Sequence, residues 1–456
     1  MTKVIQGRSK GMLWFLYNLL FPLFYALLLP KFILRMARRG GYRRHFLERF
    51  GIYGSETARR LGERRRIWIH AVSVGETYVA SSLMKEMRKR DPETAFVLTT
   101  TTSTGRRIAE KEVEKEDVVV YFPSDFPFAV KRALNRMRPL ALLLAESELW
   151  PNLVRLAGLR GLPVVLFNGR ISKSSYEGYR LGRVFFREML NSVNLFLVQS
   201  HTDKKRLVML GADQSNVEIM GSAKYDVVED DRRARKSAEE MLIRAGFDLG
   251  EPILTGGSTW PGEEDILANI YRKIKEKGGK LRLVLVPRHA ERRAEVEAVL
   301  KRHGLPCLRR SEIGKDFRAG DGDPVLLVDT TGELKSLYAC ASIIFVGKSL
   351  TQHGGQNIIE PAMYGKPVIV GPNMENFPDV MADFRAGEAV LEVHDAGELY
   401  EEVARLLDDP EARAFYGRNA ALVVREKKGV VAASVDRIIK LIGSSSDEDV
   451  SGEPGR

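Results

Sequence analysis

HGGQNIIEPAMYGKPVIVGP, residues 353–372, predicts a glycine-rich loop, a short helix and a buried strand in direct succession. The Gly-Gly pair permits a tight turn with exposed backbone amides. Asn357 can cap the helix, whose free N–H groups would attract a phosphate, and Glu360 in its first turn could accept hydrogen bonds from ribose hydroxyls. Gly365 ends the helix, and residues 366–370 form the strand. The stretch therefore predicts a nucleotide site, with an ordinary αβ unit as the alternative.

Short apolar runs alternate with polar, helix-like segments along most of the chain. One series of runs lies between residues 67 and 198, and a second lies between residues 252 and 370. Each series predicts a parallel sheet with helices on both faces. A chain of 456 residues is long enough for two such domains. We therefore predict an α/β protein with two doubly wound domains, and ligands outside the carboxyl ends of the strands.

The net charge of +11 is concentrated at the N-terminus. Residues 1–66 contain 15 Lys and Arg against 3 Glu, leaving 56 basic and 57 acidic side chains in the rest of the chain. The neutral body argues against nucleic-acid binding, and the basic arm favours an anionic surface as its partner. Cys307 and Cys340 are too few for a disulfide framework or a zinc site. We expect inert core thiols in a reducing compartment.

Residues 12–29 are apolar except for Asn18, about the minimum length for a membrane span. Pro30 and Lys31 follow them rather than a signal-peptide cleavage site. The downstream flank is the more basic one, with Lys31, Arg35, Arg38, Arg39, Arg43, Arg44 and Arg49. The positive-inside rule then places the body in the cytoplasm. We predict a single span or a deep, re-entrant anchor, with a soluble core helix as the alternative.

These patterns predict five regions. They are a membrane anchor with a basic arm (1–50), an N-terminal α/β domain (51–226), a linker with one helix (227–250), a C-terminal α/β domain (251–443) and a disordered tail (444–456). The tail is assigned from its Ser, Gly and acidic residues.

Several charged residues follow predicted strands directly. Glu76 stands where a strand ends and a helix begins, a favourable place for a general base, although acids are also common in first turns. Glu146 and Glu148 follow another strand, and one of them could be structural. Lys224 could offset negative charge as a bond breaks, or be an ordinary surface lysine. Arg288 could grip a phosphate or a nucleobase edge.

Seven further short motifs are spread along the chain, and their order is part of the signal. They are SVGE (73–76), AESELWP (145–151), FNGR (167–170), GSAKYD (221–226), GGSTW (256–260), VPRH (286–289) and GEL (332–334). With residues 353–372, they resemble the 3-deoxy-D-manno-octulosonic acid (Kdo) transferases of lipopolysaccharide assembly. These enzymes are glycosyltransferases of the GT-B class, with two Rossmann-like domains facing a cleft. The resemblance extends from about residue 12 to about residue 425.

The resemblance implies an inverting transfer of Kdo from CMP-Kdo to a lipid A precursor at the cytoplasmic side of the inner membrane. It implies that Glu76 is the general base and that Glu146 and Lys224 support the transition state. The implied cytidine monophosphate (CMP) site comprises Pro287, Arg288, Gly332, Glu333, Leu334, Asn357, Ile358, Ile359 and Glu360. No metal and no cofactor are expected, since the histidines are scattered rather than placed at metal-ligand spacing. The expected partners are CMP-Kdo, the glycolipid acceptor and anionic lipid.

Two other functions stay open on the sequence. One is a GT-B transferase that uses a UDP-sugar on a lipid acceptor, and the other is a membrane-tethered nucleotide-binding module without catalysis. The sequence does not set the number of Kdo residues added, the acyl-chain preference or the oligomeric state.

Overall fold

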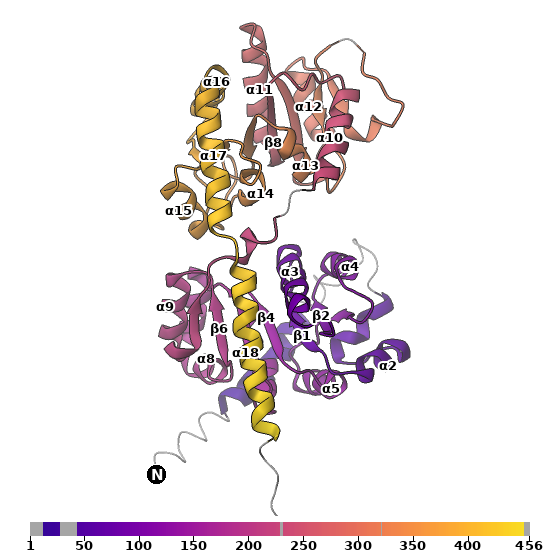
Figure 1. The fold of residues 1–456 in the computed structure, drawn as a ribbon, viewed down its shortest axis with the longest axis vertical. Helices are drawn as coiled ribbons and strands as arrows, with labels where there is room; N and C mark the ends of the chain where they lie inside the picture. The colour runs from indigo at the N-terminus through magenta and orange to yellow at the C-terminus, as the bar shows by residue number, and fades with distance from the viewer. Residues whose placement is uncertain (1–11, 28–42, 229–230, 321, 451–456) are drawn as a thin grey trace, which may run out of the picture. The chain divides into compact units, whose positions relative to one another are not determined.

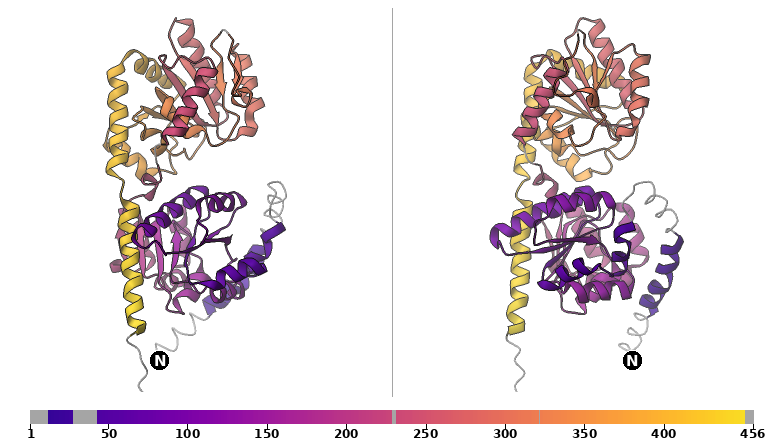
Figure 2. Two further views of the ribbon diagram at one scale, coloured as in Figure 1. Left: turned by 45° about the vertical axis from the view of Figure 1, so that its right-hand side comes forward. Right: turned by 90° about the vertical axis from the view of Figure 1, so that its right-hand side faces the viewer.

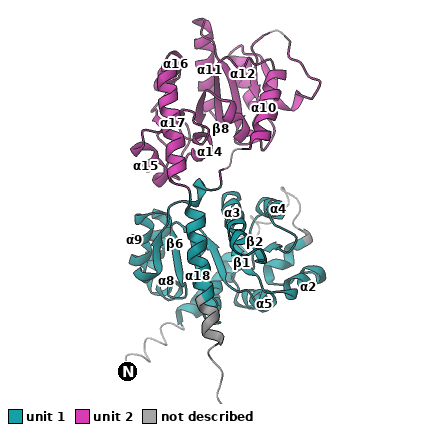
Figure 3. Ribbon diagram, viewed as in Figure 1, with its two compact units in different colours: residues 1–227, 429–456 teal, residues 228–428 magenta. Residues whose placement is uncertain are grey.

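The computed structural model describes residues 12–27, 43–228, 231–320 and 322–450. The chain forms two compact units (Figure 3): unit 1 comprises residues 1–227 and 429–456, and unit 2 comprises residues 228–428. Each unit has its own parallel sheet and hydrophobic core.

Unit 1 contains a seven-stranded parallel sheet in the order β3-β2-β1-β4-β5-β6-β7 (Figure 1). The strands are β1 (Ile67–His70), β2 (Phe96–Thr100), β3 (Val118–Tyr121), β4 (Leu142–Ala145), β5 (Val164–Gly169), β6 (Leu195–Val198) and β7 (Val217–Ile219). Apolar clusters cover both faces, so most strands are continuous apolar runs rather than alternating ones. The chain reverses its strand order at β1 and β4, which lie side by side.

Helices and short 3-10 turns connect these strands. They are η1 (Arg43–Phe50), α2 (Ser55–Glu63), α3 (Val74–Arg90), α4 (Ser103–Glu112), α5 (Pro127–Met137), α6 (Pro151–Gly158), α7 (Lys173–Leu181), α8 (Arg183–Leu190), α9 (His201–Leu210), η2 (Gln214–Asn216) and η3 (Ala223–Tyr225). Hydroxyl side chains start several of them. Ser73, Thr102 and Ser200 each accept a backbone N–H as N-caps of α3, α4 and α9.

Unit 2 repeats the architecture in the order β10-β11-β9-β8-β12-β13-β14. Its strands are β8 (Ile253–Thr259), β9 (Arg282–Pro287), β10 (Cys307–Arg309), β11 (Val325–Leu327), β12 (Ile343–Val346), β13 (Val368–Val370) and β14 (Leu391–Glu392). Its helices are α10 (Arg232–Arg244), α11 (Glu263–Glu276), η4 (Ala290–Arg292), α12 (Arg293–Arg302), η5 (Arg310–Glu312), α13 (Leu334–Cys340), α14 (Ile359–Ala362), α15 (Pro378–Ala386), α16 (Ala396–Asp408) and α17 (Pro410–Glu426). The two predicted doubly wound sheets are therefore present.

The predicted domain boundaries need two corrections. The segment 227–250 is not a free linker, because α10 packs Ala238, Met241 and Leu242 into the core of unit 2. The last helix, α18 (Val430–Val450), belongs to unit 1, where it packs against α3 (Figures 1 and 2). Its apolar residues, including Val435 and Ile438, complete a core face of the first sheet. The tail predicted to be disordered from residue 444 is helical to residue 450, and residues 451–456 lie outside the described part.

Residues 12–27 form a helix that packs one face on unit 1. Trp14 is 5% exposed and its ring centroid lies 4.6 Å from that of Phe185. The Tyr17 hydroxyl donates to Asp125 Oδ2 at 2.8 Å, and Asn152 Nδ2 donates to Asn18 Oδ1 at 2.8 Å. Within the described residues, no helix is long and apolar enough to cross a membrane. The predicted anchoring span is therefore not confirmed, and residues 28–29 of the apolar run lie outside the described part.

Several arginines of the basic N-terminal stretch have structural partners in unit 1. Arg49 is buried and donates to the Thr101 carbonyl at 2.7 Å. Arg66 is buried and donates to the carbonyl of Glu116, and Arg60 donates to the carbonyl of Asp117. Guanidinium groups satisfy carbonyls that would otherwise lose water on burial. Arg49 was predicted to face lipid and instead holds the fold. Lys31, Arg35, Arg38 and Arg39 lie outside the described residues.

Candidate functional site

Glu76 lies in the first turn of α3, at the carboxyl end of β1. Its Oε2 accepts the Val72 N–H at 2.8 Å, and its own N–H donates to Ser73 Oγ at 3.2 Å. Burial raises the pKa of this carboxyl above its usual range, and the nearby charges of Glu146 and Glu148 raise it further. A buried carboxylate with a raised pKa is a stronger proton acceptor than a solvent-exposed one. The predicted base therefore lies in surroundings that suit proton transfer.

Glu146 and Lys224 form an ion pair beside it. Lys224 Nζ lies 2.9 Å from Glu146 Oε1, with both side chains mostly shielded from solvent. Glu146 follows β4 and Lys224 belongs to η3, so residues 78 positions apart in sequence meet at one sheet edge. The tertiary structure thus brings together the three residues that the sequence analysis singled out as catalytic.

Asn168 connects Glu146 to the residue before Lys224 and was not singled out by sequence. Its Oδ1 accepts the Ala223 N–H at 3.0 Å, and its Nδ2 donates to Glu146 Oε1 at 3.4 Å. Asn168 and Glu146 both have left-handed backbones, with φ of 50° and 51°. Such conformations in non-glycine residues cluster at functional sites. The FNGR motif contained the signal, but a backbone angle cannot be read from a motif.

Glu148 faces a buried histidine at the same edge. His70 ends β1, is fully buried, and lies with its Nε2 3.6 Å from Glu148 Oε2. The Trp150 Nε1–H donates to Glu148 Oε2 at 2.8 Å. Glu148 therefore has structural partners, as expected for one of the two glutamates that flank Ser147.

The carboxyl edge of the unit 2 sheet is organised by a buried carboxylate that the sequence analysis missed. Glu263, at the start of α11, accepts the N–H groups of Trp260, Lys348, Ser349 and Leu350 at 2.8–3.1 Å. It joins the loop after β8 to the loop after β12. In sequence, Glu263 is indistinguishable from other first-turn acids, because three of its four partners lie 85–87 residues away.

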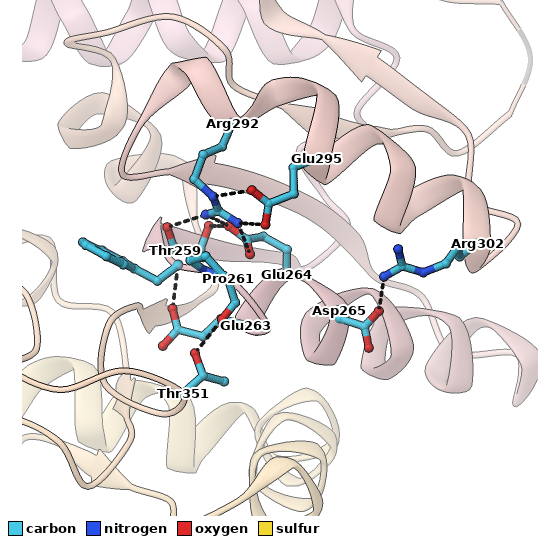
Figure 4. Close-up of polar contacts among 10 residues, drawn as sticks. Thr259, Pro261, Glu263, Glu264, Asp265, Arg292, Glu295, Arg302 and Thr351 are labelled. Atoms are coloured by element: carbon cyan, nitrogen blue, oxygen red, sulfur yellow. Dashed lines mark hydrogen bonds and ion pairs between the residues drawn. The ribbon is translucent and has the colours of Figure 1, made fainter.

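A second acidic residue braces the same loop (Figure 4). Glu264 accepts the Thr259 hydroxyl at 2.8 Å and pairs with Arg292 at 2.7 Å, while Arg292 also pairs with Glu295. The Thr351 hydroxyl donates to the Pro261 carbonyl at 2.9 Å. These contacts fix the loops that follow β8 and β12.

The predicted nucleotide residues follow different strands of this edge. Arg288 is exposed directly after β9, and its N–H donates to the Thr259 carbonyl at 3.0 Å. Glu360, in α14, has its pKa raised by burial, against the opposing charges of Lys335 and Arg288. Pro287 is buried as the last residue of β9. Arg288 and Glu360 are therefore close enough to interact electrostatically.

The other predicted residues offer mainly backbone groups. Gly332 is exposed with φ 93°, a conformation that favours glycine, and Leu334 begins α13. Glu333 pairs with Arg310 at 2.8 Å, which engages its carboxylate within the protein. Ile358 and Ile359 are fully buried, so their side chains belong to the core.

The glycine-rich loop differs from its prediction in one way, whereas the predicted short helix and its Asn357 cap are present. Its amides are not exposed: the Gly354 N–H donates to Glu375 Oε2 at 2.8 Å, and the Gly355 N–H donates to the Lys348 carbonyl at 2.9 Å. The helix is a single turn, and Asn357 Oδ1 accepts the Ile359 N–H in front of it at 3.1 Å. The turn therefore binds to its own neighbours and holds a closed loop.

Among the described residues, the two cysteines are protonated thiols, and no cluster of side chains suits a metal ion. Burial raises the pKa of the Cys307 thiol to about 12 and that of Cys340 to about 11, which keeps both protonated at neutral pH. No group of three His, Cys, Asp or Glu side chains among the described residues could hold a metal ion. In the Asp-Gly-Asp sequence at 321–323, Asp323 pairs with Lys275 and Arg282.

Both units match families of known proteins. The family model described as "3-Deoxy-D-manno-octulosonic-acid transferase (kdotransferase)" matches residues 44–227, and the model "Glycosyl transferases group 1" matches residues 324–423. The 3-deoxy-D-manno-octulosonic acid transferase of Haemophilus influenzae is 32% identical over 87% of this chain and 91% of its own length. The Bordetella pertussis protein of the same name is 33% identical over 90% of this chain and 95% of its own.

The fold has counterparts among solved structures. UDP-GlcNAc 2-epimerase from Neisseria meningitidis, bound to UDP-GlcNAc, aligns over 83% of this chain and 100% of its own with a TM-score of 0.58 and 13% identity. This likeness shows the fold alone. Two parallel seven-stranded sheets with alternating helices agree with the GT-B class predicted from the sequence.

Proposed function

The chain belongs to the 3-deoxy-D-manno-octulosonic acid (Kdo) transferase family, and from this premise we propose that it transfers Kdo from CMP-Kdo to lipid IVA, a lipid A precursor. The observation that supports this most directly is the cluster of Glu76, Glu146 and Lys224 at one sheet edge. It combines a buried carboxylate, able to accept a proton, with a lysine held by a second carboxylate.

In the proposed reaction, Glu76 accepts the proton of the acceptor hydroxyl. The hydroxyl oxygen forms a bond to the anomeric carbon of Kdo, while the bond from that carbon to the phosphate oxygen breaks and CMP departs with the electron pair. The attack inverts the anomeric carbon. Lys224 offsets negative charge on the donor as this bond breaks, and Glu146 orients Lys224 through their 2.9 Å ion pair.

Unit 2 supplies the proposed CMP contacts. Arg288 binds the phosphate or the base edge through charge-assisted hydrogen bonds, and Glu360 accepts hydrogen bonds from the ribose. Gly332, Leu334 and Ile358 contribute backbone groups. The reaction uses no metal in this proposal, because a monophosphate leaving group carries less charge than a diphosphate and the cations of the protein can offset it.

The helix of residues 12–27 supports a proposal for membrane association without a span. Its face away from Trp14 and Tyr17 is apolar and exposed, with Phe15, Leu16, Leu19, Leu20, Leu23, Phe24 and Leu27. We propose that this helix lies in the plane of the cytoplasmic face of the inner membrane. The downstream basic residues from Lys31 to Arg39 would add attraction to anionic lipid.

Incubation of the full chain in detergent with CMP-Kdo and lipid IVA tests the proposed function. Mass spectrometry should detect lipid IVA bearing one or more Kdo residues, and the yield should persist in EDTA. A parallel melting assay compares CMP with UMP and UDP, and CMP should give the larger stabilisation. Product from a UDP-sugar instead would favour the rival transferase, and CMP binding without any turnover would favour the binding module.

Vesicle co-sedimentation tests the membrane proposal. Leu20→Glu adds a charge to the exposed face of the helix and should weaken binding to anionic vesicles. Ile243→Glu adds the same charge at an exposed position of unit 2 and should leave binding unchanged. Equal binding by both variants would contradict the role of the helix.

A further inference from the structure

Lys348 is held in a backbone conformation that a lysine rarely adopts. It follows β12 at the carboxyl edge of unit 2, and its φ is 60°. Glycine adopts this left-handed region without strain, whereas a residue with a Cβ does so at a cost. Such outliers persist when their surroundings impose them, and they are common in ligand-binding loops. The presence of a lysine rather than a glycine at this position therefore requires a reason, and the side chain must supply it.

The surroundings fix both backbone groups of Lys348. Its N–H donates to Glu263 Oε2 at 2.9 Å, and its carbonyl accepts the Gly355 N–H at 2.9 Å. Gly347, directly before it, packs so tightly that an added Cβ would lie 2.6 Å from the Ser258 carbonyl oxygen. The loop therefore determines where the Lys348 side chain begins and which way it leaves the backbone.

The side chain places its ammonium beside the glycine-rich turn. Lys348 Nζ lies 5.0 Å from the centroid of the Trp260 ring, in cation–π range. The same nitrogen lies 3.4 Å from the position that a Cβ on Gly354 would occupy. The indole N–H of Trp260 is buried and has no hydrogen-bond partner among the described residues. An ammonium thus lies at the loop that the sequence assigns to nucleotide binding, beside an indole whose donor is unused.

Nearby carboxylates are directed elsewhere. Glu263 binds backbone amides, Glu264 pairs with Arg292, and Glu375 binds His353 and the Gly354 amide. In the part of the chain that the structure describes, no carboxylate lies within ion-pair distance of the Lys348 ammonium. Its positive charge therefore remains available for an anionic ligand.

We propose that Lys348 binds the phosphate of the donor nucleotide, a role that rests on the proposed function of unit 2 as the CMP-binding unit. A lysine acts on phosphate as a compact point charge with three donors. The left-handed backbone of Lys348 is retained because it directs the ammonium to the glycine-rich turn at Gly354. Lys348 is thus a specificity residue for the phosphate, acting together with Arg288, which follows β9 at the same edge of the sheet with β8 between the two strands.

Calorimetric titration of the full chain with CMP and with cytidine tests this role. Lys348→Gly removes the ammonium and suits the left-handed backbone, so the fold is retained. The variant should bind CMP roughly tenfold more weakly, as expected for a lost charge-assisted bond, while its affinity for cytidine is unchanged. Lys348→Arg should retain most of the CMP affinity.

Arg138→Gly is the matched control. Arg138 is also a cation with a left-handed backbone, φ 42°, but it ends α5 in unit 1. This variant should bind CMP like the unaltered protein. If Lys348→Gly binds CMP normally, or loses CMP and cytidine equally, the phosphate role is wrong. If the unaltered protein fails to bind CMP, the proposed function itself fails, which is a separate outcome.

Discussion

The carboxyl edges of the two sheets differ in charge although their topologies match. At the edge of unit 1, Glu146 pairs with Lys224, and burial together with the nearby charges of Glu146 and Glu148 raises the pKa of Glu76. At the edge of unit 2, the buried Glu263 is turned towards backbone amides, which leaves Arg288 and Lys348 as available charges. The same α/β framework therefore carries the proposed proton acceptor in one unit and the proposed anion site in the other. The chemistry depends on loop residues, and the sheet only brings them together.

The largest expected effect comes from the carboxylate of unit 1. Glu76→Gln should lower the transfer rate by about 10²–10⁴-fold, because the amide cannot accept the acceptor proton. Its oxygen can still accept the Val72 N–H, so folding and CMP affinity should not change. Steady-state kinetics with CMP titration measure both. A rate within a few-fold of the unaltered enzyme would show that Glu76 is not the base. The proposed difference in chemistry between the two sheet edges would then be wrong.

A large stability effect should be confined to unit 1, because it alone carries the N-terminal helix. Trp14→Ala should cost about 3–5 kcal/mol of unfolding free energy, as for other buried aromatics. Phe15→Ala, on the exposed face of the same helix, should cost no more than about 0.5 kcal/mol. Denaturant unfolding in detergent compares them. Equal costs would show that the helix does not dock.

This expectation alters the predicted outcome of a truncation. The sequence alone predicts that deleting residues 1–34 releases the protein only partly from membranes, because the basic residues from Arg35 to Arg49 remain. It also predicts intact catalysis, because every candidate catalytic residue lies after Gly75. The deletion also removes the contacts of Trp14, Tyr17 and Asn18 with unit 1. We now expect a destabilised unit 1 rather than an intact enzyme.

A smaller effect is expected from the proposed donor contacts of unit 2. Arg288→Ala and Glu360→Ala should each raise the dissociation constant for CMP roughly tenfold, since a charge-assisted hydrogen bond contributes about 1.5–3 kcal/mol. Calorimetry with CMP is the measurement, and Glu76→Gln serves as the control from the other unit. Unchanged affinity in both variants would move the donor site away from this edge.

The smallest effect concerns the pH profile. A general base must be ionised, so transfer should fall as pH decreases through the raised pKa of Glu76, at a pH above the usual glutamate range. The Glu148 charge contributes to this shift. Glu148→Gln should therefore move the acidic limb of the rate profile to lower pH. A limb that moves upward, or not at all, would show that this neighbour does not set the pKa.

The sheets could be predicted because their signal is local. Buried parallel strands such as Val118–Tyr121 and Ile343–Val346 are short apolar runs between helix-like segments, and that pattern is legible in a single sequence. Glu76, Glu146 and Arg288 could be placed at strand ends for the same reason. Parallel strands carry their carboxyl ends to one edge, so the position of each residue followed from its place after a strand.

Long-range packing could not be predicted from the sequence. An apolar run such as residues 12–27 has the same composition whether it enters lipid or rests on aromatic side chains of its own protein. Nothing local marks α18 as a helix of unit 1, because its apolar face meets α3 more than 300 positions earlier and η3 about 200 positions earlier. Arg49 and Arg66 carry the same charge as surface arginines, and only the carbonyls they meet make them structural.

The sequence by itself determined two doubly wound α/β domains, the family and the strand-end positions of the candidate residues, because periodicity and motif order are properties of neighbouring residues. The tertiary structure decided which distant groups meet. It pairs Glu146 with Lys224 and directs Glu263 to the backbone amides of the loop after β12. It also assigns the first and last helices to unit 1. It also decided the left-handed backbones of Glu146, Asn168 and Lys348. Asparagine tolerates this conformation, whereas for Glu146 and Lys348 distant hydrogen bonds and close packing impose it against the local preference of the residues.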